Sequence, residues 1–599
     1  MFTTSKLICA PEGTQVSVGA PLSSAQPSAS RATVRPKTRL VTVKMSGAKH
    51  DLAIPYVLTE LTNGDAILRY CVDTKDALAQ AAQSPVQQGA ASVVGEAVQP
   101  ALRAGFIEAR GAEPKTQLEY AQEGIITPEM EYVALRESAA NLEFFAPASD
   151  SVAAAAHDSH MGGKFQDSVE QGLCTYDREA GVITLNAAKM AVTPELVRAE
   201  IAAGRAVLPA NHHHPESEPM IIGKRFLTKV NANIGASAVS SDFSEEIGKL
   251  KLALRFGADT VMDLSTGLDD LAGLRSAIIR ASAVPIGTVP VYEALDRVHG
   301  DASALTWEVF RQVIIDQAQQ GVDYFTIHAG FTKDLLPAAA ARLMGVVSRG
   351  GAIMASNMML NDSENLAYAH FDELMAICRK YDVALSLGDG LRPGAVYDAC
   401  DAAQYGELKN IGMLAARCKE HGVQCFIEGP GHVPLDRVEE NQRLEDEYCH
   451  EAPFYTLGPL VSDVGAGFDH ITSAIGGTNI AAYGTSMLCY VTPSEHLALP
   501  TPEDVKQGLI CYKLAAHAAD LAKHVPQAIN IDHAMSRARA TFRWLDQFVL
   551  SFDEAHAYEV WRAQMDEENC NHSAAYCSMC GPRFCPIRLN RRLQAKYAK

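Results

Sequence analysis

The sequence predicts a mixed α/β protein built around a (β/α)8 barrel, with a small N-terminal appendage and a C-terminal helical segment that ends in a cysteine-rich arm. From residue 200 onward, short apolar runs rich in Val and Ile alternate with helical segments, which is typical of βα units on a parallel sheet. Eight such runs favour a closed barrel. An open doubly wound sheet would normally carry a GxGxxG sequence after its first strand, and none stands there.

The expected strands alternate in order with the expected helices. They are Ala206–Ala210, Leu227–Asn233, Thr260–Leu264, Pro285–Pro290, Asp323–His328, Val383–Gly388, Val423–Glu428 and Phe454–Gly458. After residue 500 the pattern is helical, and Thr501 before Pro502 is a good helix start.

Outside the barrel, predicted over residues 200–499, three further regions are expected. Residues 1–49 hold one acid, Glu12, against seven Lys and Arg in a background of Ser, Thr, Ala and Pro, which predicts a transit peptide and favours a plastid (chloroplast stroma) over the cytoplasm. A bland disordered tail would look similar. Residues 50–199 are expected to form the N-terminal appendage and the segment that leads into the barrel, and no motif in residues 50–112 supports a function. Residues 500–599 are expected to form the C-terminal helices and the arm.

Charge and composition exclude several classes of partner. The formal charge of −19 argues against binding to nucleic acid or anionic lipid, since such surfaces need excess Lys and Arg. No apolar run of about 18 residues appears, so no membrane span is predicted. An anionic substrate would need a local basic pocket.

The sharpest motif is C-x2-C-x4-C, formed by Cys577, Cys580 and Cys585. Three thiolates on a short segment can hold three irons of a [4Fe–4S] cluster and leave the fourth iron open for S-adenosylmethionine. Two alternatives stay open on spacing alone. One is a zinc knuckle with Cys570 or His572 as fourth ligand, and the other is an electron-transfer cluster.

Polar residues cluster where the expected strands end, and barrel enzymes build their sites from those loops. Any one of them could be a turn residue, but eight in phase are hard to explain as turns. They are Asn211 with His212 to His214, Asn233, Asp263 with Ser265, Tyr292, His328, Asp389 with Arg392, Glu428 with His432, and Tyr455.

Two arginines on glycine-flanked loops could supply the basic pocket. Arg349 and Arg392 pair a bidentate guanidinium with glycines that permit close approach, which suits a phosphate, although ordinary turn chemistry is an even alternative for either loop. His432 and His496 are candidate metal ligands. The triplet His212–His214 is interpreted as structural, because consecutive side chains of an extended chain point to opposite faces.

From about residue 115 to 586 the chain resembles the phosphomethylpyrimidine synthase (ThiC) family, whose members are radical S-adenosylmethionine enzymes. The matching segments are 116–118, 124–130, 214–220, 257–267, 450–458, 469–476 and the terminal cysteine motif.

The resemblance implies a site, a fold and a reaction. It implies a substrate site for 5-aminoimidazole ribonucleotide, a zinc ion on His432 and His496, and a [4Fe–4S] cluster on Cys577, Cys580 and Cys585. The substrate residues implied are Asn233, Met262, Tyr292, His328, Ser348, Arg349, Gly350, Asp389, Gly390, Leu391, Arg392, Glu428 and Tyr455. It also implies a homodimeric barrel, an electron donor such as ferredoxin or flavodoxin, and a carbon–carbon lyase of thiamine biosynthesis. That enzyme would make 4-amino-2-methyl-5-hydroxymethylpyrimidine phosphate and release carbon monoxide and formate.

Three segments depart from the family pattern. We expect them to be loops that flank the barrel mouth. Residues 355–359 read Ala-Ser-Asn-Met-Met where Ala-Lys-Trp-Cys-Leu is usual, residues 477–483 lack the usual Ala-Met-Ile-Gly-Trp run, and His212-His213 replaces Ile-Asn. Two alternatives therefore remain: the related 5-hydroxybenzimidazole synthase, and a catalytically silent paralogue.

Overall fold

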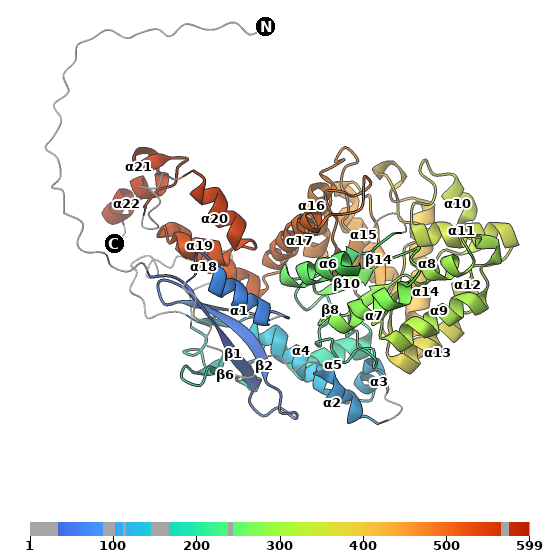
Figure 1. Cartoon of the computed structure of the whole chain (residues 1–599), viewed down its shortest axis with the longest axis horizontal. Helices are drawn as coiled ribbons and strands as arrows, with labels where there is room; N and C mark the ends of the chain where they lie inside the picture. The colour runs from blue at the N-terminus through green and yellow to red at the C-terminus, as the bar shows by residue number, and fades with distance from the viewer. Residues whose placement is uncertain are drawn as a thin grey trace, which may run out of the picture. The chain divides into compact units, whose positions relative to one another are not determined.

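A computed structural model describes residues 34–72, 74–87, 102–111, 115–144, 167–237, 243–564 and 574–597. The part of the chain that is green to orange in Figure 1 contains a closed barrel of parallel strands. The strand order is β9-β10-β11-β12-β13-β14-β15-β16 and back to β9. This confirms the predicted (β/α)8 barrel. The strands are β9 (Lys229–Ile234), β10 (Thr260–Asp263), β11 (Ile286–Thr288), β12 (Tyr324–Ile327), β13 (Ala384–Leu387), β14 (Cys425–Gly429), β15 (Phe454–Leu457) and β16 (Met487–Cys489).

One expected strand lies outside the barrel, and one barrel strand was not expected. The run Ala206–Ala210 contributes only β7 (Ala206–Val207), which pairs antiparallel with β8 (Ile222–Gly223). The eighth position of the barrel belongs to β16, which pairs with β15 and β9. The prediction of Ala206–Ala210 was wrong because burial in a short hairpin gives the same apolar pattern as burial in a barrel.

Alternate residues of the barrel strands face the interior, and several of them are polar. Asn231 of β9 accepts hydrogen bonds from the hydroxyls of Thr260 (2.8 Å) and Tyr324 (3.0 Å) across the barrel. The ring of Tyr324 occupies the space where a Cβ on Gly287 would lie only 2.1 Å from Tyr324 Cε2, so β11 needs glycine there. Side chains thus fill the barrel interior toward the amino ends of the strands. The carboxyl ends are left for a site.

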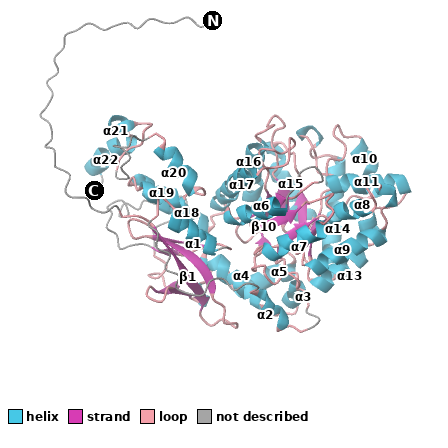
Figure 2. Cartoon of the chain, viewed as in Figure 1, coloured by secondary structure: helices cyan, strands magenta, loops and turns pink. Residues whose placement is uncertain are grey.

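Helices surround the barrel (Figure 2). Most of them contribute buried apolar residues to the core around it. In chain order they are α6 (Phe243–Arg255), α7 (Leu271–Ala281), α8 (Pro290–Arg297), α9 (Trp307–Gln320), α10 (Leu336–Ala340), α11 (Arg349–Asn361), α12 (Leu366–Ala369), α13 (Phe371–Tyr381), α14 (Ala402–Glu420), α15 (Val438–Tyr448), α16 (Asp469–Tyr483) and α17 (Pro502–Ala522). The predicted start of α17 is confirmed: Thr501 caps it by accepting the N–H of Asp504, and Pro502 stands in its first turn.

The region before the barrel contains a six-stranded sheet in the order β4-β3-β2-β1-β6-β5. Its strands are β1 (Lys37–Met45), β2 (Ile54–Glu60), β3 (Ala66–Arg69), β4 (Glu143–Phe144), β5 (Cys174–Asp177) and β6 (Val182–Leu185). The helices are α1 (Thr74–Gln83), α2 (Arg103–Glu108), α3 (Gln117–Gln122), α4 (Pro128–Ala139) and α5 (Pro194–Ala203). β1 lies within residues 1–49, which the sequence assigned to a presequence, and it pairs with both β2 and β6.

The C-terminal helices are α18 (Pro526–Ala540), α19 (Trp544–Leu550), α20 (Glu554–Arg562), α21 (Gly581–Phe584) and α22 (Pro586–Tyr597). α18 to α20 share an apolar cluster with Leu61 and Ile67 of the N-terminal sheet. Asp546 strengthens this contact by accepting hydrogen bonds from the backbone and hydroxyl of Thr62 (2.9 and 2.8 Å). Among the described helices, none combines the length and the apolar character that crossing a membrane requires.

Candidate functional site

The carboxyl ends of the barrel strands carry most of the predicted site residues. Asn233 lies in β9, Met262 in β10, Glu428 in β14 and Tyr455 in β15, and His328 directly follows β12. All five occupy positions whose side chains alternate toward the interior. The structure therefore gathers these residues at one end of the barrel.

An arginine flanked by two carboxylates forms one side of the site. Arg392 Nη1 lies 2.6 Å from Asp389 Oδ1 and 4.0 Å from Glu428 Oε2. The other oxygen of Glu428 accepts hydrogen bonds from the hydroxyls of Thr326 (2.8 Å) and Ser386 (2.9 Å). Both hydroxyls come from inward positions of neighbouring strands, so Glu428 is fixed in place.

Two carboxylates keep Arg392 charged. Burial works against the charge of Arg392, but Asp389 and Glu428 outweigh it and hold its pKa above the usual value. Arg392 therefore remains a cation that is held in place by Asp389 and Glu428.

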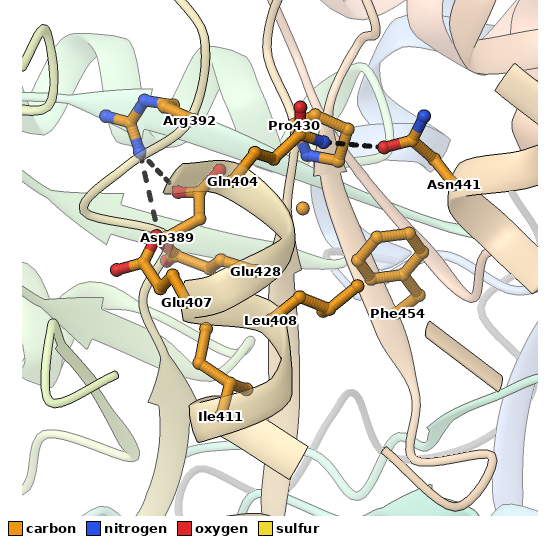
Figure 3. Close-up of a pocket in the computed structure, with 11 residues that line it drawn as sticks. Asp389, Arg392, Gln404, Glu407, Leu408, Ile411, Glu428, Pro430, Asn441 and Phe454 are labelled. Atoms are coloured by element: carbon orange, nitrogen blue, oxygen red, sulfur yellow. Dashed lines mark hydrogen bonds and ion pairs between the residues drawn. The ribbon is translucent and has the colours of Figure 1, made fainter. Parts of the chain in front are cut away.

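A small cavity of about 20 Å³ adjoins this arginine (Figure 3). Helix α14 projects Gln404, Glu407, Leu408 and Ile411 into it, opposite Asn441 and Phe454. The remaining lining residues are Asp389, Arg392, Glu428, Gly429 and Pro430. The cavity thus extends outward from the site, between the barrel wall and α14.

The second predicted arginine loop meets His328. Ser348 caps α11 by accepting the N–H of Gly351, and its Oγ lies 3.1 Å from His328 Nε2. Burial and then Arg392 lower the pKa of His328 to about 3, so this imidazole is neutral near pH 7. The guanidinium of Arg349 lies over the ring of Tyr292, with its carbon 4.8 Å from the ring centroid.

This arrangement suits an anion. The first N–H groups of α11 and the positive end of the helix dipole lie beside Arg349. Arg349 and this helix end form a local basic site of the kind that a phosphorylated ligand needs on a negative chain.

The sequence missed two polar residues deeper in the barrel. Asn231 donates hydrogen bonds to the hydroxyl of Tyr455 (2.8 Å) and to Asn233 Oδ1 (2.8 Å). Cys489 Sγ lies 3.2 Å from Asn233 Nδ2, and burial raises the pKa of this thiol to about 11. The alternation of Asn231 with Asn233 could have revealed the first, whereas Cys489 stands in β16, which was not recognised.

His432 and His496 come together although they are far apart in sequence. Their ring centroids are 5.4 Å apart. His432 Nδ1 donates to Asp463 Oδ1 (2.8 Å), and His496 Nδ1 donates to Asp469 Oδ2 (3.1 Å). Each carboxylate thereby fixes the imidazole in the tautomer whose Nε2 can act as a ligand.

The cysteine motif encloses the short helix α21 of the arm. Cys577 and Cys580 precede α21, and Cys585 lies between α21 and α22. Burial raises the pKa of Cys580, and the thiols of Cys577 and Cys585 add to the shift. In the described part of the chain, no three His, Cys, Asp or Glu side chains are already arranged to hold a metal ion. Cys570 and His572, the possible zinc-knuckle ligands, lie outside the described residues.

The histidine triplet lies at the opposite end of the barrel, where the strands begin. His214 Nδ1 lies 2.6 Å from Asp323 Oδ2, just before β12 begins, and His214 is fully buried. Burial lowers the pKa of His212 to about 3, which keeps it neutral. The structure brings the triplet to no predicted site residue, in line with the structural interpretation.

Two of the departures from the family pattern are not loops. Residues 355–359 lie within α11 and residues 477–483 within α16. Asn357 is buried there and donates to the carbonyls of Ala302 (2.8 Å) and Leu305 (2.9 Å). The expectation that these segments are mouth loops was wrong, because glycines and polar residues inside helices resemble loop composition.

Comparison with known proteins gives one match that covers most of the chain. The description of the matching family is "Radical SAM ThiC family", and the match spans residues 116–592. Among solved structures, a dihydropteroate synthase from Coxiella burnetii is 11% identical, with 49% of this chain and 94% of that chain covered and a TM-score of 0.30. A dihydropteroate synthase from Thermus thermophilus is 12% identical, with 48% and 92% covered and a TM-score of 0.28.

Proposed function

This chain belongs to the radical SAM ThiC family, and we propose that it converts 5-aminoimidazole ribonucleotide into 4-amino-2-methyl-5-hydroxymethylpyrimidine phosphate, releasing carbon monoxide and formate. Membership makes it a radical S-adenosylmethionine enzyme of thiamine pyrimidine biosynthesis, with a [4Fe–4S] cluster and S-adenosylmethionine. The substrate, the products and the assignment as a carbon–carbon lyase are the proposal.

The observation that carries the proposal is the arginine-bearing start of α11, which Ser348 joins to His328 at the carboxyl end of the barrel. Arg349 and the first turn of α11 would bind the phosphate of the ribonucleotide. His328, neutral near pH 7, would hydrogen-bond the ligand without repelling a cationic neighbour. Glu428, fixed by two hydroxyls, would accept a donor of the aminoimidazole or ribose.

The three thiols of the arm are the soft donors that iron–sulfur clusters take, and they stand at C-x2-C-x4-C spacing. Cys577, Cys580 and Cys585 would hold three irons. When bound, the cluster would supply the electron that cleaves S-adenosylmethionine to a 5′-deoxyadenosyl radical.

The paired imidazoles fit a zinc ion. His432 and His496 would bind it through Nε2, since their Nδ1 atoms are held by Asp463 and Asp469. Two protein ligands leave positions for the ligand's own groups, which makes this a site open to substrate.

Partners and location complete the proposal. We propose a homodimer, reduction by a ferredoxin or flavodoxin, and import into the plastid stroma. A presequence that is removed would end before Lys37, because β1 pairs on both sides within its sheet and the loss of β1 would split that sheet.

The test is product identification. The anaerobically reconstituted protein is incubated with reductant, S-adenosylmethionine and 5-aminoimidazole ribonucleotide, and the products are identified by mass. The pyrimidine phosphate together with 5′-deoxyadenosine supports the proposal. 5-Hydroxybenzimidazole would assign the alternative synthase, and no turnover despite an intact cluster would identify a silent paralogue.

A further inference from the structure

Glu407 is a fully buried carboxyl on α14 that stands outside the ring of predicted ligands. Only 2% of it is exposed, and it faces the cavity beside Arg392 (Figure 3). No ion pair to it is formed among the described residues, because Arg392 is already engaged by Asp389 and Glu428. A buried carboxyl without a cationic partner is costly, so its presence calls for a role.

Its contact is with the backbone of the Arg392 loop. Glu407 Oε2 accepts the N–H of Leu391 at 2.6 Å, and that backbone group is buried. Leu391 stands between Gly390 and Arg392, both in the loop after β13. The hydrogen bond therefore fixes the residue that sets the direction of the Arg392 side chain.

The same backbone also supports the second arginine loop. A Cβ placed on Gly351 would lie only 2.4 Å from the carbonyl oxygen of Gly390, so the first turn of α11 rests directly on Gly390. A shift of Gly390 would therefore displace the start of α11 and, with it, Arg349. Through one backbone contact, Glu407 reaches both cationic loops.

Burial raises the pKa of Glu407 well above the usual value, and the nearby Asp389 adds to the shift, while the Leu391 N–H and Arg342 oppose it. Its Oε1 has no hydrogen-bond partner among the described residues.

We propose that Glu407 is a positioning residue of the nucleotide site, which holds the Gly390–Leu391 backbone and so aligns Arg392 and the start of α11 without touching the ligand. The inference deepens the proposed function and rests on it for the identity of the ligand. The placement of the loop itself does not depend on which ligand binds.

The test compares two variants of the full-length protein with a matched control. Glu407→Leu removes the acceptor, whereas Glu407→Gln keeps an oxygen that can accept the Leu391 N–H. Glu445→Leu is the control, because Glu445 is also fully buried on a neighbouring helix, has a raised pKa and contacts neither loop. The readouts are KM and kcat for 5-aminoimidazole ribonucleotide, and deuterium exchange of the peptide that contains Leu391.

An unpaired buried N–H should loosen the loop and weaken nucleotide binding by about fivefold or more. We expect Glu407→Leu to raise KM by that factor and to speed exchange at Leu391, while Glu407→Gln and Glu445→Leu stay within about twofold of the wild type in KM. An unchanged KM and unchanged exchange in Glu407→Leu would overturn the proposal.

Failure of the proposed function and failure of the proposed role of Glu407 can be told apart. If the wild type does not use 5-aminoimidazole ribonucleotide, the proposed function fails, but the exchange measurement still tests the hold on the loop. Faster exchange in Glu407→Leu alone then supports that hold, and equal exchange in all variants refutes it.

Discussion

Asp463 should control how tightly the histidine pair binds zinc. Its Oδ1 accepts the N–H of His432 Nδ1 at 2.8 Å, so it fixes both the ring orientation and the tautomer. Asp463→Ala removes this acceptor and lets the imidazole turn its Nε2 away from His496. We expect the zinc affinity of the variant to fall while both proposed ligands remain.

The magnitude follows from the contact that is lost. A hydrogen bond to a charged group contributes about 1.5–3 kcal/mol, which corresponds to roughly 10- to 150-fold in an equilibrium constant. Loss of a carboxylate that orients a metal-bound imidazole typically weakens metal binding by about 10- to 100-fold. Both routes predict a dissociation constant at least about tenfold higher for Asp463→Ala.

The assay is competition for zinc against a chromophoric chelator at fixed pH. Asp436→Ala is the matched control, since Asp436 is an exposed acid four residues after His432. Asp469→Ala should behave like Asp463→Ala, because Asp469 holds His496 in the same way. Equal zinc affinity for Asp463→Ala and Asp436→Ala would refute the reasoning, and no zinc binding by the wild type would refute the site itself.

Three further changes have expected outcomes. Cys580→Ala should abolish the charge-transfer absorption of the reconstituted cluster and leave the thermal midpoint unchanged, because the motif lies outside the barrel core; normal S-adenosylmethionine cleavage would show that the triad is wrongly assigned. Gly351→Ala should lower the free energy of unfolding by about 1–3 kcal/mol in chemical denaturation, since its Cβ would lie 2.4 Å from Gly390 O; wild-type stability would mean that α11 can move away freely. Burial raises the pKa of Glu218 to about 8, so the folded state keeps a proton that the unfolded chain releases, and stability should fall as pH rises from about 4.5 to 8. Glu218→Gln should flatten this dependence in denaturation curves at pH 5 and 8, and an identical slope would assign the effect to other groups.

The alternation of apolar runs with helical segments was sufficient to predict the barrel. It did not show which apolar run forms the eighth strand. Seven of the barrel strands coincide with expected runs, whereas β16 (Met487–Cys489) follows α16 after only three residues and was not among those runs. The hairpin strand β7 gave an equally apolar run, since its burial has the same cause. The N-terminal sheet was not predicted because β1 and β6 pair across more than a hundred residues, a contact that no local pattern reports.

The candidate site, like the fold, could be predicted only in part from the sequence. Residues at strand ends, such as Asp389 and Glu428, could be found from position alone, and the family resemblance supplied their expected roles. Glu407 could not, because a glutamate within a helix is usually solvated, and only the fold turns this one toward the Leu391 N–H. Cys489 was missed together with its strand.

The central claim is that the barrel site presents the ribose of 5-aminoimidazole ribonucleotide to the radical from S-adenosylmethionine. The most direct test uses substrate deuterated on the ribose with the reconstituted, reduced protein, and measures the mass of the 5′-deoxyadenosine that forms. Deuterium in 5′-deoxyadenosine, in step with formation of the pyrimidine phosphate, is the predicted result. 5′-Deoxyadenosine that forms without deuterium, or at the same rate without the nucleotide, would contradict the account.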